Sequence, residues 1–195
     1  MVSLKLTKPA VFLDRDGVII EEVNHLHHLD QVRLISGSGR SIKRLINAGY
    51  WVIVVTNQSV IARGLLDEDG LCGIHQVMTD KLAEVDGYID RIYYCPHHPT
   101  AGYGKYKVDC NCRKPNPGMI QKAQSDFHIN MDASWVVGDK ISDIALGANL
   151  GLRNILVLTG HGKEHLSLTR STYPDTLIVS DLSEAVKVIL GENLS

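Results

Sequence analysis

The strongest constraint on the fold is the repeated alternation of short, apolar β-branched runs with segments of helical periodicity. Trp51–Thr56 is an almost unbroken apolar run, which is typical of a strand buried on both faces. Ser38–Ala48 carries its apolar residues at helical spacing, and Gly49 follows as a suitable C-terminal cap. Alternating strands and helices predict a parallel sheet with helices on both faces. We therefore expect an α/β fold built on one doubly wound, Rossmann-like parallel sheet.

The rest of the chain continues this pattern without an internal repeat or a clear linker, so residues 1–195 are expected to form a single domain. No insertion is large enough for a separate cap domain. Further strands are predicted at Ala10–Leu13, Ile89–Tyr94, Trp135–Val137, Asn154–Leu158 and Leu177–Val179. Further helices are predicted at Asp67–Val85, from Asn116-Pro117 (N-cap and first helical residue) to about Phe127, at Ser142–Asn149, at about Lys163–Ser171, and from Asp181, which forms a capping-box pattern with Glu184.

Composition excludes several classes of partner. The formal net charge of −2 gives no general attraction for nucleic acid or for an anionic membrane. No apolar run approaches the ~20 residues that span a bilayer, and Met1–Pro9 lacks the apolar core of a signal peptide. We therefore predict a cytoplasmic protein with no nucleic-acid or membrane partner. The lack of obvious exposed apolar repeats favours a monomer.

Polar residues that suit phosphoryl transfer follow the apolar runs, where ligands bind in a doubly wound sheet. Asp14 and Asp16 follow the first run two residues apart, a spacing that lets both face one substrate atom. The set combines a nucleophilic carboxylate, a second acid, a hydroxyl, a lysine and further acids that supply the oxygen ligands of Mg²⁺. The other members are Thr56, Asn57, Gln58 and Ser59, then Lys114, then Asp139, Lys140 and Asp143.

Each of these residues also has an ordinary explanation when it is taken singly. Asp14-Arg15-Asp16-Gly17 could be a solvated turn, Thr56 a strand-end hydroxyl and Asp139 a turn residue. An EF-hand is excluded because its glycine belongs at position 6 of the loop. No Walker loop or G-x-G-x-x-G motif is present. The joint occurrence of these residues, in order and each near a strand end, favours the phosphatase interpretation.

Three of the four cysteines fall in a C-x-H…C-x-C cluster, in a loop at about residues 95–113. Cys95, His97, Cys110 and Cys112 would make a closed tetrahedral zinc site without an open position for water, so we predict structural Zn²⁺. Buried free thiols are the alternative. His98 is the less favoured ligand, and Cys72 is expected to pack within a helix.

At this point the chain resembles the haloacid dehalogenase superfamily of phosphatases. The resemblance rests on Asp14-x-Asp16, Thr56, Lys114 and Asp139-xxx-Asp143. It implies that Asp14 attacks phosphorus to give an aspartyl-phosphate, and that Asp16 is the general acid and base. It further implies that Thr56 and Lys114 hold phosphoryl oxygens. Asp14, the main-chain carbonyl of Asp16, and Asp139 would bind catalytic Mg²⁺, with Asp143 as a supporting acid.

Longer motifs closely resemble those of D-glycero-D-manno-heptose 1,7-bisphosphate 7-phosphatases between about Ala10 and Thr159. They are Phe12–Gly17, Thr56–Gly64, Tyr93–Pro99 and Cys112-Arg113-Lys114-Pro115. The resemblance implies removal of the C7 phosphate of a sugar bisphosphate on the route to nucleotide-activated heptose for lipopolysaccharide. It implies substrate contacts from Glu22, Val23, Asn24, His25, Asn57, Gln58, Ser59, Arg113 and Lys140.

Two departures from this family leave alternatives open. Val60 stands where the family usually has glycine, and a β-branched residue resists positive φ. Val18–Glu22 also departs from the usual Thr-Ile-Asn. A histidinol-phosphate phosphatase is the close alternative, and a catalytically retired zinc-bearing binding module is the alternative from another class. The sequence does not indicate which anomer of the C1 phosphate is preferred.

Overall fold

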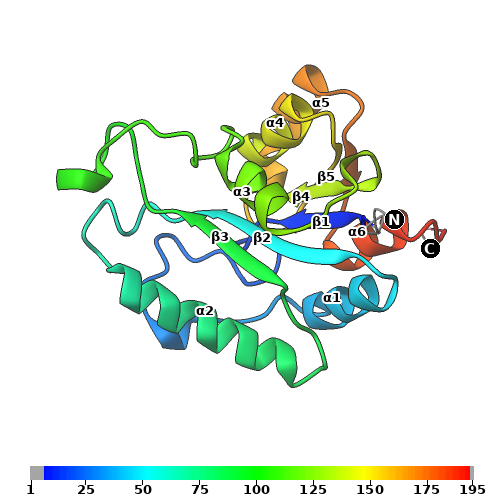
Figure 1. Ribbon diagram of the computed structural model, residues 1–195, viewed down its shortest axis with the longest axis horizontal. Helices are drawn as coiled ribbons and strands as arrows, with labels where there is room; N and C mark the ends of the chain where they lie inside the picture. The colour runs from blue at the N-terminus through cyan, green and yellow to red at the C-terminus, as the bar shows by residue number, and fades with distance from the viewer. Residues whose placement is uncertain (1–6, 194–195) are drawn as a thin grey trace, which may run out of the picture.

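The computed structural model describes residues 7–193, so most of the Met1–Pro9 segment lies outside the described residues. Six parallel strands form one sheet in the order β3-β2-β1-β4-β5-β6 (Figure 1). This order confirms the predicted doubly wound sheet, with its switch point between β1 and β4. The strands are β1 (Ala10–Leu13), β2 (Trp51–Asn57), β3 (Arg91–Cys95), β4 (Trp135–Gly138), β5 (Arg153–Val157) and β6 (Leu177–Val179).

Helices cover both faces of the sheet (Figure 1). One face packs against α1 (Ser38–Asn47), α2 (Glu68–Ala83) and α6 (Leu182–Ile189). The other packs against α3 (Gly118–Asp126) and α4 (Ile141–Asn149), and α5 (Gly162–Thr172) lies beside α4. Short 3₁₀ turns occur at Leu29–Gln31, Gly104–Tyr106 and Met131–Ala133.

The central strand β1 shows why the core has two layers. Val11 and Leu13 belong to the core beneath α1, α2 and α6, whereas Ala10 and Phe12 belong to the core beneath α3 and α4. All four side chains are fully buried, because successive residues of a strand point to opposite faces and both faces are covered. The unbroken apolar runs in the sequence are therefore the inner strands of the sheet.

Local hydrogen bonds shift several predicted boundaries. Strand β3 begins two residues late because the Asp90 carboxylate accepts the backbone N–H of Val52, at 2.8 Å. The expected N-cap Asn116 is wrong: its side-chain amide donates to the Cys110 carbonyl, and Pro117 is the N-cap of α3. Asp181 does cap α6 by accepting from the Glu184 backbone N–H at 3.0 Å.

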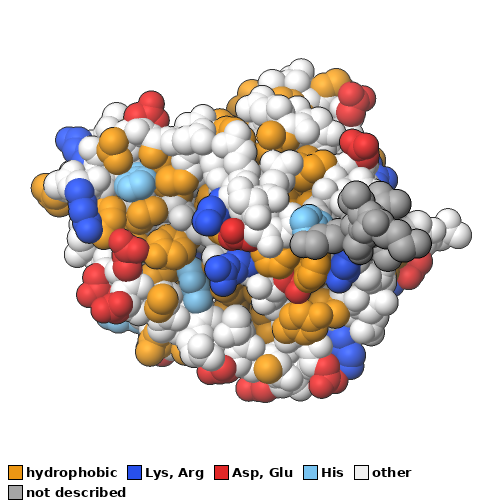
Figure 2. All heavy atoms as spheres, in the orientation of Figure 1, with side chains coloured by type: hydrophobic (Ala, Val, Ile, Leu, Met, Phe, Trp, Pro, Cys, Tyr) orange, Lys and Arg blue, Asp and Glu red, His pale blue; other side chains and the backbone are white. Residues whose placement is uncertain are grey.

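Two further expectations concern surface properties. Cys72 is exposed on α2, so the prediction that it packs within the helix interface is wrong. Acidic and basic side chains are interspersed over the face of the molecule drawn in Figure 2. Within residues 7–193, every helix is too short or too polar to cross a membrane.

Candidate active site

Three predicted acids meet at the carboxyl edge of the sheet. Carboxylate oxygens of Asp14, Asp139 and Asp143 all lie within 4.8 Å of one another, and each residue is at most 6% exposed. Asp14 follows β1, and Asp139 follows β4, its neighbour in the sheet. Gly17 makes this approach possible, because it has a φ of +77° and an added Cβ would lie 2.3 Å from the Asp139 carboxylate.

Lys114 holds this cluster together. Its buried ammonium lies 3.0 Å from Asp14, 2.7 Å from Asp143 and 2.7 Å from the carbonyl of Val55. Burial opposes its charge, but the two carboxylates more than offset burial and raise the pKa of Lys114 above its usual value. All three donors of the ammonium are thus engaged with the cluster and with β2.

The same ammonium decides the charge of the predicted nucleophile. Burial by itself raises the pKa of Asp14, but Lys114 and then Lys140 outweigh it, so the pKa of Asp14 lies below its usual value. Burial raises the pKa of Asp143, against the opposing effect of Lys114. Asp14 is therefore an ionised carboxylate, as a nucleophile must be.

Asp139 has the properties expected of a metal ligand. Its Oδ2 accepts the His161 backbone N–H at 2.8 Å, while its Oδ1 is buried and makes no hydrogen bond. Burial, followed by the charge of Asp14, raises the pKa of Asp139 to about 8. A hard cation would neutralise both effects, and carboxylate oxygens are the ligands that Mg²⁺ prefers. The residues present therefore fit Mg²⁺.

Asp16, the predicted acid and base, does not join this cluster. Its carboxylate accepts from Arg15 Nη2, at 2.9 Å to each oxygen, and from Gln58 Nε2 at 2.8 Å. Gln58 Nε2 also donates to the hydroxyl of Thr56 at 2.9 Å. Gln58, predicted as a substrate contact, therefore also joins the Asp16 carboxylate to the Thr56 hydroxyl of β2.

A cavity of about 270 Å³ opens beside these residues. It is lined by all nine residues predicted to contact substrate, although they come from four separate segments. It is also lined by Asp16, whereas Asp14, Thr56 and Lys114 are buried outside the lining. The predicted lining residues are Glu22, Val23, Asn24, His25, Asn57, Gln58, Ser59, Arg113 and Lys140; the others are Arg15, Leu26, Val60, Ser142 and His161.

Three predicted substrate contacts, Asn57, Lys140 and Glu22, also make hydrogen bonds within the protein. The Asn57 amide accepts from the backbone N–H of Lys114 at 3.0 Å and donates to its carbonyl at 3.2 Å, which fixes the lysine beside the acids. The Lys140 ammonium donates to Glu22 at 2.9 Å across the cavity. A single lysine–glutamate pair thus joins the loop after β1 to the loop after β4.

The loop that departs from the family pattern has an ordinary backbone. Among residues 7–193, the non-glycine residues with positive φ are His25 and Asp86, so Val60 avoids the conformation it resists. Val60 is 4% exposed and packs with Ile61 and Leu71. Its side chain therefore forms part of the cavity wall and anchors the loop.

The structure brings the four predicted zinc ligands together. The sulfur of Cys95 lies 3.5 Å from that of Cys110 and 3.0 Å from that of Cys112, and His97 Nδ1 lies 3.3 Å from Cys112. These distances are too long for a disulfide and slightly shorter than the roughly 3.8 Å expected around tetrahedral zinc with Zn–S of about 2.3 Å. His98 accepts from the backbone N–H groups of Thr100 and Ala101 instead. The donor set therefore fits Zn²⁺.

This cluster is connected to the cavity. Arg113 directly follows Cys112 and lines the cavity. Its guanidinium donates to the carbonyl of His97 at 3.0 Å. Tyr94 and Tyr106 both donate to the carboxylate of Glu68 at the start of α2, at 2.7 and 2.6 Å. The loop that carries the Cys/His cluster is thus joined to β3 through Cys95 and to α2 through Tyr106.

Sequence reasoning missed the contribution of the loop after β5. Thr159 donates its hydroxyl to the carbonyl of Gly17 at 2.6 Å, Gly160 packs against Asp139, and His161 lines the cavity. Thr159-Gly160-His161-Gly162 follows an apolar run, as the other site residues do. Their position directly after an apolar run is the sequence signal that could have identified them as site residues.

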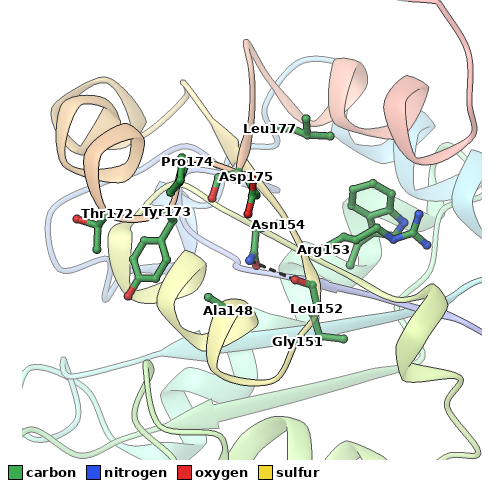
Figure 3. A pocket seen from close by; sticks show the side chains of 12 residues that line it. Ala148, Gly151, Leu152, Arg153, Asn154, Thr172, Tyr173, Pro174, Asp175 and Leu177 are labelled. Carbon is green, nitrogen blue, oxygen red and sulfur yellow. Dashed lines mark hydrogen bonds between the residues drawn. The ribbon is translucent and has the colours of Figure 1, made fainter.

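A second cavity lies at the opposite, amino end of the strands (Figure 3). It measures about 520 Å³ and includes Arg153, whose guanidinium stacks 4.2 Å from the Trp135 ring centroid. Among its described lining residues Asp175 is the only carboxylate, so it lacks the acid cluster that phosphoryl transfer requires. The smaller cavity at the carboxyl edge is therefore the candidate active site.

Comparison with known proteins agrees with this chemistry. Residues 111–185 match the family model described as "HAD-hyrolase-like". The chain is 40% identical to the D-glycero-beta-D-manno-heptose-1,7-bisphosphate 7-phosphatase of Photorhabdus laumondii, over 94% of this chain and 96% of that protein. It is 43% identical to the protein of the same name from Escherichia coli K12, over 78% of this chain and 80% of that protein.

A solved structure is similar over the whole fold. The D,D-heptose 1.7-bisphosphate phosphatase from B. bronchiseptica, crystallised with magnesium and phosphate, matches with a TM-score of 0.84 and 33% identity. The match covers 95% of this chain and 99% of that chain. The similarity thus extends over nearly the full length of both chains.

Proposed function

The chain belongs to the D-glycero-β-D-manno-heptose-1,7-bisphosphate 7-phosphatase family of HAD-like hydrolases, and from this premise we propose that it removes the C7 phosphate of that sugar bisphosphate. The step would serve the synthesis of nucleotide-activated heptose for lipopolysaccharide. The observation that carries the proposal is an ionised Asp14, held by Lys114 at the edge of a cavity lined by all nine predicted substrate contacts.

In the first half of the reaction, Asp14 attacks the phosphorus of the C7 ester. A bond forms between the carboxylate oxygen and phosphorus, and the bond from phosphorus to the sugar oxygen breaks. Asp16 gives its proton to the departing alkoxide, which leaves as the C7 hydroxyl. Lys114 orients Asp14 and keeps it ionised. Thr56 would hold a phosphoryl oxygen, and Lys114 would hold another by turning one N–H from its present carboxylate partners to the phosphoryl group.

In the second half, water hydrolyses the aspartyl-phosphate. Asp16, now ionised, takes a proton from the water as the water oxygen bonds to phosphorus. The bond from phosphorus to Asp14 then breaks, which restores the carboxylate and releases inorganic phosphate. The position of Asp16 in the cavity lining, where water has access, suits this second role.

Two metal ions complete the proposal. Asp14, the main-chain carbonyl of Asp16, and Asp139 would hold Mg²⁺, with Asp143 supporting Lys114 and the cluster. When bound, Mg²⁺ supplies positive charge that offsets the charge of the phosphoryl group and the acids. Cys95, His97, Cys110 and Cys112 would hold structural Zn²⁺, and thereby fix Arg113 and Lys114 at the end of the zinc loop.

The cavity suits a sugar that carries two phosphate groups. Arg113 and Lys140 bring two cations to its wall, and the planar guanidinium of arginine matches a phosphate better than a single ammonium does. We assign Arg113 to the remaining C1 phosphate and the Glu22–His25 segment to sugar hydroxyls. The names of the bacterial relatives specify the beta compound, so we propose preference for the β anomer of the C1 phosphate.

The decisive experiment is phosphate release from a panel of esters with Mg²⁺ present. The panel contains both anomers of heptose 1,7-bisphosphate, histidinol phosphate and an aryl phosphate, with Asp14→Asn as the inactive control. We expect the highest kcat/KM with the β bisphosphate and loss of activity in the control. Faster turnover of histidinol phosphate would contradict the substrate assignment. Activity no higher than that of Asp14→Asn on every ester would favour the retired binding module.

A further inference from the structure

Among the described residues, Arg15 is the largest fully buried side chain, and it lies directly behind the general acid. Its Nη2 donates to both carboxylate oxygens of Asp16 at 2.9 Å and to Gln58 Oε1 at 2.8 Å, and its Nε donates to Asp16 at 3.2 Å. Arg15 is 1% exposed. A buried guanidinium requires several acceptors, and those on one side of it are Asp16 and Gln58.

The other side of the guanidinium is anchored by His75 of α2. Arg15 Nη1 lies 3.2 Å from His75 Nε2, and the histidine is 8% exposed. An arginine offers only donors, so Nε2 must be the acceptor and the ring must be neutral with its proton on Nδ1. Burial, and then the charge of Arg15, lower the pKa of His75 to about 3, which agrees with this neutral form.

This anchor joins the general acid to a rigid part of the fold. His75 sits in the middle of α2, between the core residues Ile74 and Met78, and its ring lies 6.0 Å from that of Tyr94 in β3. Without the His75 acceptor, the guanidinium would lose its tie to α2, and its remaining described partners, Asp16 and Gln58, both line the cavity. The orientation of the Asp16 carboxylate therefore depends on a histidine that does not line the cavity.

We propose that His75 is a positioning residue, which orients Asp16 for proton donation by fixing the Arg15 guanidinium. The inference deepens the proposed function, on which it rests for the role of Asp16 as the acid. His75 does not line the cavity and takes no part in the proposed bond changes. The acceptor atom at the Nε2 position is the property that matters.

The test uses the dependence of the reaction on its leaving group. The sugar alkoxide needs a proton to depart, whereas p-nitrophenolate departs without one. The quantity kcat/KM covers steps only through the first departure, so the later base role of Asp16 does not enter it. We expect His75→Leu to lower the ratio of kcat/KM for the bisphosphate to kcat/KM for p-nitrophenyl phosphate about tenfold. This loss is smaller than the roughly 10²–10⁴-fold rate increase that a general acid contributes, because Asp16 itself is retained.

Conservative variants separate positioning from general structure. His75→Gln keeps an acceptor near Nε2 and should restore the wild-type ratio of the two kcat/KM values. His75→Asn is one methylene shorter and should lower the ratio, which gives a second loss variant should leucine disturb folding. Met78→Ala, on the same helix, should lower the melting temperature and leave the ratio unchanged.

Two results would overturn the inference. One is an equal loss on both substrates in the His75 variants, since that describes a merely structural histidine. The other is that His75→Leu and His75→Asn both keep the wild-type ratio of kcat/KM for the bisphosphate to kcat/KM for p-nitrophenyl phosphate. If the wild-type enzyme does not hydrolyse the bisphosphate, the proposed substrate is wrong, and the same ratio is then measured with glycerol phosphate as the alkyl ester. The two failures are thus distinguishable.

Discussion

Replacing Asp139 by asparagine should abolish activity and yet stabilise the magnesium-free protein. The Asp139 carboxylate is fully buried, its Oδ1 makes no hydrogen bond, and its nearest cation, the Lys140 ammonium, is 3.8 Å away. Burial and the charge of Asp14 raise the pKa of Asp139 from 3.8 to about 8. A negative charge on Asp139 is therefore unfavourable in the folded protein without a bound cation.

The sign and size of this stability difference follow from the protons that the folded and unfolded states bind. Between pH 4 and pH 8 the folded state holds a proton on Asp139 that the unfolded state has released, so stability falls as pH rises. At about 1.4 kcal/mol per pKa unit, the uptake of this proton on folding costs about 3 kcal/mol at pH 6 and about 5 kcal/mol at pH 7.5. The asparagine of the Asp139→Asn variant would carry no such cost, and its amide oxygen could still accept from the His161 backbone N–H.

Urea denaturation at pH 6 and pH 7.5, in buffer without Mg²⁺ and without chelators, measures this difference. We expect Asp139→Asn to be more stable than wild type, with a gap that widens by about 2 kcal/mol between the two pH values. Adding Mg²⁺ should close the gap by stabilising the wild type alone. Asp132→Asn, at an exposed acid, should show neither effect. A variant less stable than wild type, or a gap independent of pH, would refute the reasoning.

Three further predictions concern the lysine, the zinc loop and the arginine. Lys114→Met should lower stability by about 3–5 kcal/mol, because it leaves Asp14 and Asp143 buried without their cation, and kcat should fall below detection; unchanged urea stability would contradict the ion-pair assignment. Cys110→Ser should lower the melting temperature and raise KM with little effect on kcat, and the zinc content measured by metal analysis should drop; a variant with wild-type stability and KM would argue against a structural metal. Arg113→Ala should raise KM for the bisphosphate at least tenfold but leave KM for p-nitrophenyl phosphate nearly unchanged, because only the bisphosphate presents a second anion; equal changes in the two KM values would rule out a contact with the C1 phosphate.

Most of the fold could be predicted from the sequence because burial on both faces produces unmistakable apolar runs. The expected strands and helices are all found, and the errors lie at their ends, as at Asp90 and Asn116. Those ends depend on single side-chain hydrogen bonds, to Val52 and to Cys110, which join residues of different elements. Residue periodicity carries no information about such partners.

The candidate site was predictable for a related reason: parallel strands end at one edge, so polar residues after apolar runs must meet there. This rule predicted that Asp14 and Asp139 would meet, and ligand spacing predicted the Cys/His cluster, whereas Lys114 was selected by its place before the helix at Pro117 and by the family resemblance. His75 belongs to no motif, whereas His161 follows an apolar run and could have been found by the same rule.

The sequence by itself therefore determined the alternating fold, the acids at the strand ends and the residues of the two candidate metal sites. Only the tertiary structure decided how these groups are charged and oriented. Lys114 keeps Asp14 ionised while the neighbouring Asp139 holds a proton, and a buried arginine fixed from α2 holds Asp16. The reason is physical: residue type and spacing are local properties, whereas desolvation and the distance between charges exist only after distant segments have packed together.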